Sequence, residues 1–191
     1  MHNCSQALSI PGWNFYYSIF CRLSSKDTST SYFVLTSSQV FHMEEDQYIP
    51  GNIIYTDGYS IKTSNGQTTS IVVGNATSSG YTEGRGANAR FQYIFDILQL
   101  TSEELLVPDY SNYCIRHVNR TTGNTTQYIG QCRKSGSGQV QFGVGSLIGY
   151  PKYVIRDNQM PHHILFAYWY SSTLYLAHFN MKNKIVSPFI L

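Results

Sequence analysis

The residues in this chain whose type and spacing most clearly suggest chemistry are its cysteines. The 191-residue sequence contains four of them, at Cys4, Cys21, Cys114 and Cys132. Their spacing allows two local pairs, whereas the common zinc sites are built on CxxC units, which this sequence lacks. An even number of cysteines without a metal motif favours disulfides and an oxidising compartment. Buried free thiols are the alternative.

A second chemical signal is the set of N-glycosylation motifs. The pattern Asn-x-Ser/Thr occurs at Asn3, Asn75, Asn119 and Asn124. Such motifs receive a glycan on surface loops of secreted proteins. We expect glycans at Asn75, Asn119 and Asn124, and therefore an extracellular or cell-surface protein. The first residues do not have the basic and apolar regions of a signal peptide.

The sequence shows no recognisable catalytic or metal-binding motif. His162 and His163 are adjacent, so on a strand their side chains would point in opposite directions instead of sharing a metal. The acidic run Glu44–Asp46 lacks the spacing of a calcium loop, and the glycine-rich stretch 134–149 lacks the Gly-Lys-Ser/Thr unit of a phosphate loop. A Gly-x-Ser-x-Gly elbow is missing, while a Ser-His-Asp triad assembled from distant residues stays open. We therefore predict no catalytic residue, no metal ligand and no cofactor.

Composition indicates the fold class. Charged residues make up 13% of the chain, against roughly 25% in an average soluble domain, aromatic residues make up 15%, and the net charge is +2. This low net charge argues against a nucleic-acid binder, and the many aromatic residues argue against disorder. No apolar run approaches the roughly 18 residues of a membrane span. A chain so rich in Tyr, Phe, Val, Ile and Thr is expected to be all-β.

Strand-like runs recur at short spacing between turn residues, and helical periodicity is almost absent. The expected strands are Phe15–Arg22, Tyr32–Thr36, Val40–Glu44, Ile53–Asp57, Ser60–Thr63, Thr69–Val73, Tyr93–Leu98, Leu105–Asp109, Tyr113–Asn119, Thr126–Ile129, Tyr153–Arg156, Ile164–Trp169, Leu174–Phe179 and Ile185–Phe189. Many short strands at regular spacing indicate a sandwich, a barrel or a propeller.

An internal repeat separates these options. The segments 80–133 and 134–191 share one order of inner strand, loop, hydrophobic strand, turn and amphipathic strand, and a shorter copy begins at Ile53. Each unit is about a four-stranded meander, the size of a propeller blade. We expect a partial blade in 51–79 and an irregular β region or degenerate blade in 1–50. The predicted fold consists of antiparallel four-stranded meander blades of an incomplete β-propeller, about three to four blades at ~40–50 residues each.

This arrangement suggests how the cysteines pair. Cys114 and Cys132 flank the last two strands of the unit 80–133, which are antiparallel neighbours in a meander. We therefore predict a Cys114–Cys132 disulfide that clamps an outer hairpin. Cys4 and Cys21 have similar spacing and are the second expected pair.

The unit 80–133 resembles an NHL repeat. Gly80-Tyr81-Thr82-Glu83-Gly84 is similar to that family's opening Gly-x-x-Asp-Gly, and Leu106–Arg116 to its hydrophobic strand followed by Asp, Asn and Ile-Arg. Tyr128-Ile129-Gly130 is similar to its closing hydrophobic-Gly unit. The motif residues are Gly80, Gly84, Phe91, Asp109, Asn112, Ile115 and Gly130, with Pro151 in the next unit. In style the unit resembles secreted or cell-surface animal members of the family.

Physical chemistry gives these motif residues structural roles. Gly80 and Gly84 allow a tight passage from one blade to the next. Asp109 and Asn112 can accept turn amides, with a site role for Asp109 as the minor alternative. Strand alternation predicts that four side chains fill the spaces between blades: Leu105, Val107, Ile115 and Val118.

The resemblance implies a six-bladed propeller, which has more blades than this chain supplies. We expect the remaining blades to come from a longer chain or from self-association. Loops on propeller faces and a Tyr-rich surface favour a non-enzymatic extracellular module that binds a protein or a glycan, and a structural matrix component shares these features. The alternative is a fragment of a metal-dependent lyase- or lactonase-like enzyme. That enzyme needs inward-pointing His, Glu or Asp from several blades, and the first strands supply Asp96 and Arg156.

Overall fold

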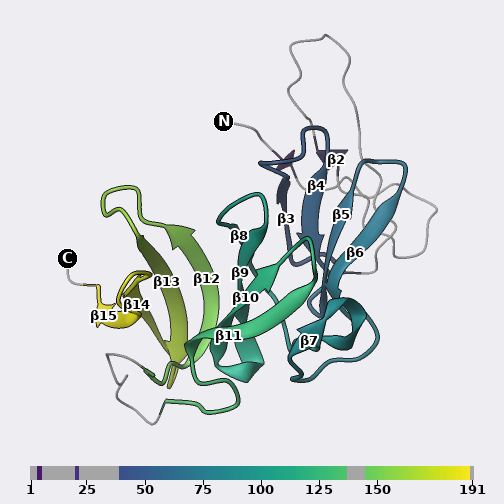
Figure 1. Ribbon diagram of the computed structural model, residues 1–191. Coiled ribbons are helices and arrows are strands. Elements are labelled where there is room, and N and C mark those ends of the chain that lie inside the picture. Colours follow the sequence, from purple (N-terminus) through teal and green to yellow (C-terminus); the bar gives the residue numbers. More distant parts are fainter. Residues whose placement is uncertain (1–3, 6–19, 22–38, 137–144, 190–191) are drawn as a thin grey trace.

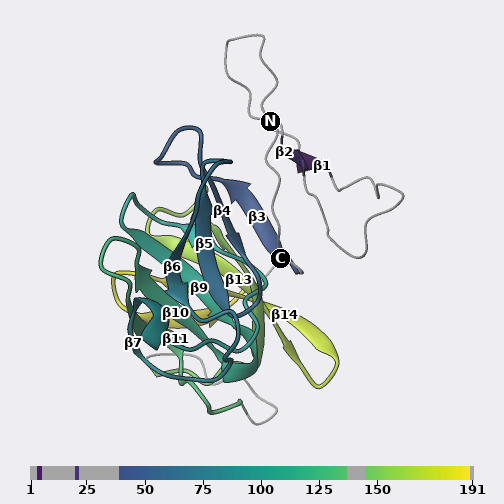
Figure 2. The same ribbon diagram turned by 90° about the vertical axis from the view of Figure 1, so that its right-hand side faces the viewer.

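The chain folds into antiparallel β-sheets. The computed structural model describes four ranges, residues 4–5, 20–21, 39–136 and 145–189. Within these ranges there is no α-helix, and the helical turns are the 3-10 segments η1 (Gly86–Asn88) and η2 (Tyr110–Asn112). The larger sheets lie face to face in an open arc (Figure 1), and they overlap when the molecule is turned by 90° (Figure 2). The predicted all-β class, with antiparallel sheets that correspond to blades of a partial propeller, is confirmed.

The first sheet is a four-stranded meander in chain order. Its strands are β3 (His42–Glu45), β4 (Ile53–Thr56), β5 (Ser60–Ser64) and β6 (Thr69–Gly74). The repeat in the sequence began this unit at Ile53, whereas the structure adds β3 before that residue. The inner strand of the first sheet therefore lies inside the N-terminal region 1–50.

The second and third sheets follow the same pattern. The second has the order β7-β11-β10-β9-β8, with β7 (Gly84–Arg85), β8 (Leu98–Gln99), β9 (Glu104–Asp109), β10 (Cys114–Asn119) and β11 (Asn124–Gly130). The third is a meander of β12 (Tyr150–Arg156), β13 (His163–Tyr170), β14 (Thr173–Asn180) and β15 (Ile185–Pro188). The β13–β14 hairpin extends beyond the neighbouring sheets in Figure 2.

The predicted strand Tyr93–Leu98 is wrong for most of its length. Only Leu98 belongs to a strand there, and Ile94 forms an isolated bridge to Asp109. The backbone N–H of Ile94 donates to the carbonyl of Gly58, 2.8 Å away in the turn between β4 and β5 of the first sheet. Tyr93 has a left-handed φ of 68°. Contacts with a different sheet therefore shape this segment, and its local hydrophobic pattern does not show them.

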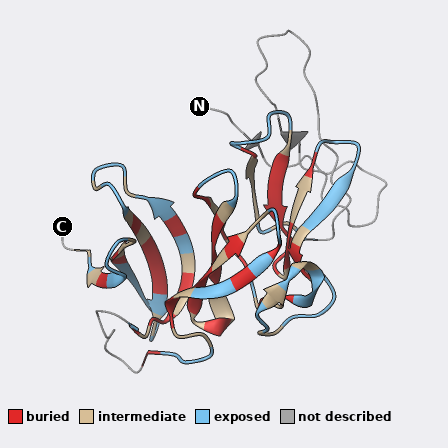
Figure 3. Ribbon diagram, in the orientation of Figure 1, coloured by how far each residue is buried: buried red, intermediate tan, exposed pale blue. Residues whose placement is uncertain are grey.

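The core lies between the sheets, as strand alternation predicts. On the second sheet, Leu105, Val107 and Val118 pack against the first sheet through Ile54, Ile61 and Val73. The neighbouring positions Leu106, Ile115 and Ile129 face the other way and pack against the third sheet through Val154, Ile164, Phe166 and Phe179. Strands β9 and β10 of the second sheet thus each contribute side chains to both cores. Buried positions run through the centre of the arc (Figure 3).

The N-terminal segment is described only at β1 (Cys4–Ser5) and β2 (Phe20–Cys21), which pair antiparallel. The predicted strand Tyr32–Thr36, most of Phe15–Arg22 and the motif at Asn3 lie outside the described residues. In the described ranges, no helix has the length and apolar character needed to cross a membrane.

Candidate binding surface

The hairpin formed by β10 and β11 is closed by the predicted disulfide. Cys114 begins β10 and is fully buried, and its sulfur is bonded to that of Cys132, with the two Cα atoms 4.9 Å apart. In the β1–β2 pair the backbone of Cys4 lies opposite that of Cys21. The side chains of those two cysteines lie outside the described residues, so their bridge stays a prediction.

Next to the disulfide, Gly130 ends β11 where only glycine fits. Its φ is +81°, and a Cβ atom there would lie 2.8 Å from the carbonyl oxygen of Tyr113. Residues with side chains rarely adopt this φ, and the contact is closer than a Cβ atom tolerates. The closing glycine of the motif therefore allows β11 to lie close against the start of β10.

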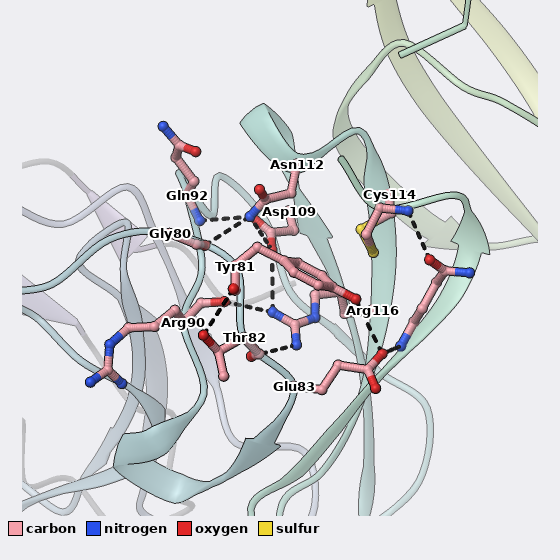
Figure 4. Close-up of a disulfide and its surroundings, with 12 residues drawn as sticks. Gly80, Tyr81, Thr82, Glu83, Arg90, Gln92, Asp109, Asn112, Cys114 and Arg116 are labelled. Atoms are coloured by element: carbon pink, nitrogen blue, oxygen red, sulfur yellow. Dashed lines mark hydrogen bonds and ion pairs between the residues drawn. A yellow bond between two sulfur atoms is a disulfide. The ribbon is translucent and has the colours of Figure 1, made fainter. Parts of the chain in front are cut away.

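Asp109 is the centre of a buried polar cluster at the end of β9 (Figure 4). Its side chain has no exposed surface, and its Oδ1 accepts the backbone N–H of Gln92 at 2.8 Å. Its Oδ2 accepts from the Asn112 side-chain amide at 2.9 Å and lies 3.4 Å from the Arg116 guanidinium. We call Asp109, Asn112 and Arg116 the Asp109 cluster.

Arg116 joins this cluster to the connection that precedes the second sheet. Its guanidinium donates to the carbonyls of Arg90 at 2.6 Å and Thr82 at 2.9 Å. It also lies over the rings of Tyr81 and Phe91, 4.9 Å and 4.7 Å from their centroids. A cation held in this way is satisfied by carbonyls and ring faces as well as by its carboxylate. Apart from Arg116 Nε, which is buried without a hydrogen-bond partner, the polar side-chain groups described above are paired within the protein, which supports a structural role for the Asp109 cluster over a catalytic one.

Burial raises the pKa of Asp109 from 3.8 to about 6, although its hydrogen bonds and Arg116 act in the opposite direction. Between these two values the folded protein binds the proton more tightly than the unfolded chain. The free energy of unfolding contributed by Asp109 should therefore fall as the pH rises from about 4 to about 6.

This pH dependence is measurable as the difference in unfolding free energy between the wild type and Asp109→Asn, by urea denaturation across that range. The Asn variant removes the titrating group and keeps the shape. A difference that is flat or rises with pH would contradict the assignment.

The remaining motif residues occupy strands and the chain segments between sheets. Gly80 accepts a hydrogen bond from the Asn112 side chain at 2.9 Å. Gly84 begins β7, Ile115 is buried in β10, and Pro151 is buried in β12. The glycosylation candidates lie at strand ends: Asn75 just after β6, Asn119 at the end of β10 and Asn124 at the start of β11. Asn124 is exposed and the other two are partly exposed.

A continuous row of aromatic rings crosses all three large sheets, and no pattern in the sequence indicated it. The row, which we call the aromatic row, consists of Phe41, Tyr59, Tyr93, Phe95, Tyr110, Tyr113 and Tyr150. The rings follow one another in contact in the order Tyr59, Tyr93, Phe95, Tyr110, Tyr150 and Tyr113, and Phe41 joins at Phe95. The centroids of contacting rings lie 4.7–6.2 Å apart. This spacing is typical of aromatic pairs that stabilise one another.

Equivalent elements of each sheet position these rings. Phe41 immediately precedes β3, Phe95 precedes β8, and Tyr150 begins β12, so all three come from the starts of inner strands. Tyr59 lies in the turn between β4 and β5, and Tyr110 in the turn between β9 and β10. In an antiparallel meander these turns and starts lie at the same end of the sheet. The repeat therefore places the aromatic row along one end of the arc.

The chemistry of the aromatic row combines stacking with hydrogen bonding. Phe41 and Tyr93 are exposed, and the Tyr113 hydroxyl lies 3.1 Å from that of Tyr150. Tyr93 and Tyr113 adopt left-handed φ values of 68° and 60°. Large side chains seldom take this conformation, and strained residues of this kind cluster at binding sites.

A cation adjoins the aromatic row at its third-sheet end. The ammonium of Lys152 lies 5.0 Å from the ring centroid of Phe95 and 5.3 Å from that of Tyr153. Tyr153 is itself exposed. The surface can therefore offer ring faces, phenolic hydroxyls and one positive charge to a ligand.

The inner strands also bring together polar residues from different sheets. His42 Nδ1 lies 3.1 Å from Asp96 Oδ1 and His42 Nε2 lies 3.8 Å from Glu44. Burial lowers the pKa of His42, but the neighbouring carboxylates of Glu44 and Asp96 outweigh it and raise that pKa overall. Asp96 Oδ2 accepts the backbone N–H of Val154 at 2.8 Å, so this carboxylate connects all three large sheets. Among the described residues, no group of three or more His, Cys, Asp or Glu is arranged to hold a metal ion.

Comparison with known proteins supports the fold and goes no further. No family model and no curated protein matches the chain. A solved crystal structure, of a structural genomics protein of unknown function from Bacteroides thetaiotaomicron, is similar with a TM-score of 0.56 at 14% sequence identity. The match covers 91% of this chain and 41% of that one. At such low identity the similarity concerns the fold alone, and together with the sheets described above it supports a β-propeller-like architecture.

Proposed function

We propose that this chain is an extracellular, non-enzymatic binding module of the NHL-propeller type, and that its protein or glycan ligand lies along the aromatic row. The observation that carries the proposal is the continuity of the aromatic row across three sheets. Rings that only filled a core would lie between the sheets, whereas these lie at the sheet ends and two of them are exposed. Exposed Tyr and Phe supply large, rigid contact areas and are enriched in binding sites.

Buried polar residues next to the aromatic row support a binding role for it. Tyr110 and Tyr113 flank the Asp109 cluster, and η2 connects them. Phe95 precedes Asp96, whose carboxylate joins the sheets. Binding residues held by rigid elements lose little conformational entropy when a ligand arrives. The buried polar clusters thus fit a role in holding the binding rings in place.

The extracellular part of the proposal rests on the disulfide and on the position of the glycosylation motifs. Disulfides such as Cys114–Cys132 are typical of oxidising compartments. Asn75, Asn119 and Asn124 lie at strand ends on the surface, where a glycan could be attached without disturbing a core.

Tyr93→Asn tests the proposal, because Asn removes the ring and still accepts the left-handed φ. We expect this change to weaken binding at least about 10-fold, a typical effect for an exposed aromatic contact residue. The measurement is binding of the immobilised chain to a glycan array and to an extracellular protein fraction. The control is Tyr175→Asn, since Tyr175 is 39% exposed, close to the 38% of Tyr93, but lies on β14 outside the aromatic row.

Ligand retention by Tyr175→Asn together with loss by Tyr93→Asn would support the proposal. Equal binding by both variants, or no enriched ligand at all, would refute it. Zinc or calcium that copurifies with the wild-type protein in stoichiometric amount would favour the enzyme alternative instead.

A further inference from the structure

The third sheet carries a large apolar surface on the face that points away from the second sheet. The side chains on this face, which we call the open face, are 36–55% exposed: Tyr153, Ile155, Trp169, Leu174, Leu176 and Ile185. The exposed stretch of β12 is visible in Figure 3. Monomeric proteins seldom expose contiguous apolar patches of this kind without using them.

The strand register shows that these side chains are neighbours. Tyr153 on β12 is opposite Ala167 on β13, which is opposite Leu176 on β14. Trp169 is opposite Leu174. Directly paired residues lie on the same face of a sheet about 5 Å apart. The apolar side chains on β12, β13 and the start of β14 therefore form one continuous surface, and Ile185 lies at its edge, opposite Asn180.

The second sheet shows what such a face does in this protein. Its face toward the third sheet contains the cross-strand pair Leu106 and His117, and Leu106 belongs to the core between the two sheets. On the third sheet the corresponding cross-strand pair is Leu165 and His178, on the open face. The open face is thus the repeat equivalent of a surface that already binds a β-sheet of this chain.

The open face is electrically suited to meet a copy of itself. Its paired strand positions carry no Asp, Glu, Lys or Arg, and its titratable groups are Tyr153, His163 and His178, with the two histidine rings 6.1 Å apart. The neighbouring ammonium of Lys152 lies between the rings of Tyr153 and Phe95, 5.3 Å and 5.0 Å from their centroids, toward the aromatic row. Asp157 at its rim lies 3.1 Å from His178. Two apposed copies would therefore bring no pair of like-charged carboxylates or ammonium groups into a buried interface.

Head-to-tail stacking is a poorer solution for this chain. It would require the outer face of the first sheet to be available, and Ile53 and Tyr55 on that face are already buried. A closed two-fold arrangement uses the same face twice and leaves no open end.

We propose that the open face is a homodimer interface, in which two copies of the chain pack β12–β15 against β12–β15 about a two-fold axis. The two sheets would then lie about 10 Å apart, like the sheets of a β-sandwich. The aromatic rows lie at the sheet ends and stay accessible in this arrangement, whereas Tyr153, which adjoins the row through Lys152, would be covered by the second copy.

The oligomeric state of the full chain in solution tests this proposal. Sedimentation velocity or light scattering up to about 100 µM should give twice the chain mass of 21.7 kDa. Leu176→Lys places a charge in the centre of the open face and should raise the dimer Kd at least about 100-fold, because an unpaired charge would be buried. Ile71→Lys on β6 is the control, since Ile71 is 52% exposed, between the 41% of Leu176 and the 55% of Ile155, but lies on the first sheet.

Circular dichroism checks that the variants are folded. If Leu176→Lys does not fold, Ile155→Lys on the same face takes its place. A dimer that Ile71→Lys keeps and that Leu176→Lys or Ile155→Lys loses supports the proposal. Three outcomes overturn it: a monomeric wild type, an open-ended oligomer, or a dimer that both open-face variants retain. A monomer would leave the face to a sheet from another polypeptide.

Discussion

Asp109→Ala is expected to lower the free energy of unfolding by about 3–5 kcal/mol, the usual cost of breaking a buried ion pair from one side. The change leaves the Arg116 guanidinium fully buried without its carboxylate. It also removes the acceptor of the Gln92 backbone N–H and of the Asn112 side chain. Since single domains are stable by only about 5–15 kcal/mol, much of the native stability would be lost.

Urea denaturation followed by tryptophan fluorescence measures this effect. Glu104→Ala is the matched control, because Glu104 also pairs with a basic residue, His117, but its side chain is 45% exposed. Exposed pairs contribute less than about 1 kcal/mol. Asp109→Ala combined with Arg116→Met removes both charges and should recover part of the loss. If Asp109→Ala were as mild as Glu104→Ala, the Asp109 cluster would not hold the second sheet together.

Local sequence patterns were sufficient to predict the parts of the fold that depend on neighbours in the chain. The alternation of side chains along a strand identified four core positions, Leu105, Val107, Ile115 and Val118, because successive side chains point to opposite faces of the sheet. The disulfide was predictable because β10 and β11 are consecutive strands of one meander. The motif position of Asp109 indicated a turn, and its contact with Asn112 lies in the following 3-10 turn, whereas the backbone amide it accepts comes from Gln92, 17 residues earlier in the chain.

Contacts between distant segments were not predictable from these patterns. The motif included Arg116 only as part of an Ile-Arg pair, since its acceptors on Thr82 and Arg90 lie 34 and 26 residues away. The rings of the aromatic row looked like ordinary strand residues, because their contact arises only when three sheets stack. His42 and Asp96 likewise come from different repeat units. The wrong strand at Tyr93–Leu98 has the same origin, because its partner Gly58 belongs to the first sheet.

Removal of the Cys114–Cys132 disulfide by the double change to alanine is expected to cost about 3 kcal/mol, because the bridge closes a loop over a sequence separation of 18 residues in the unfolded chain. Alanine is preferred to serine, since Cys114 is fully buried and a serine hydroxyl there would need a partner. In the folded protein the bridge holds the start of β10 against the end of β11, whose Ile129 packs on the third sheet. The loss should therefore loosen β11 before the β9–β10 pair.

Two measurements distinguish this from a general loss of packing. Urea denaturation gives the total change, and hydrogen exchange should rise more at Ile129 on β11 than at Leu106 on β9. Peptide mapping without reduction should show Cys114 and Cys132 joined in the wild type. Alkylatable thiols at both positions, or a stability change well under 1 kcal/mol in the double variant, would mean that the hairpin is held by its strand pairing alone.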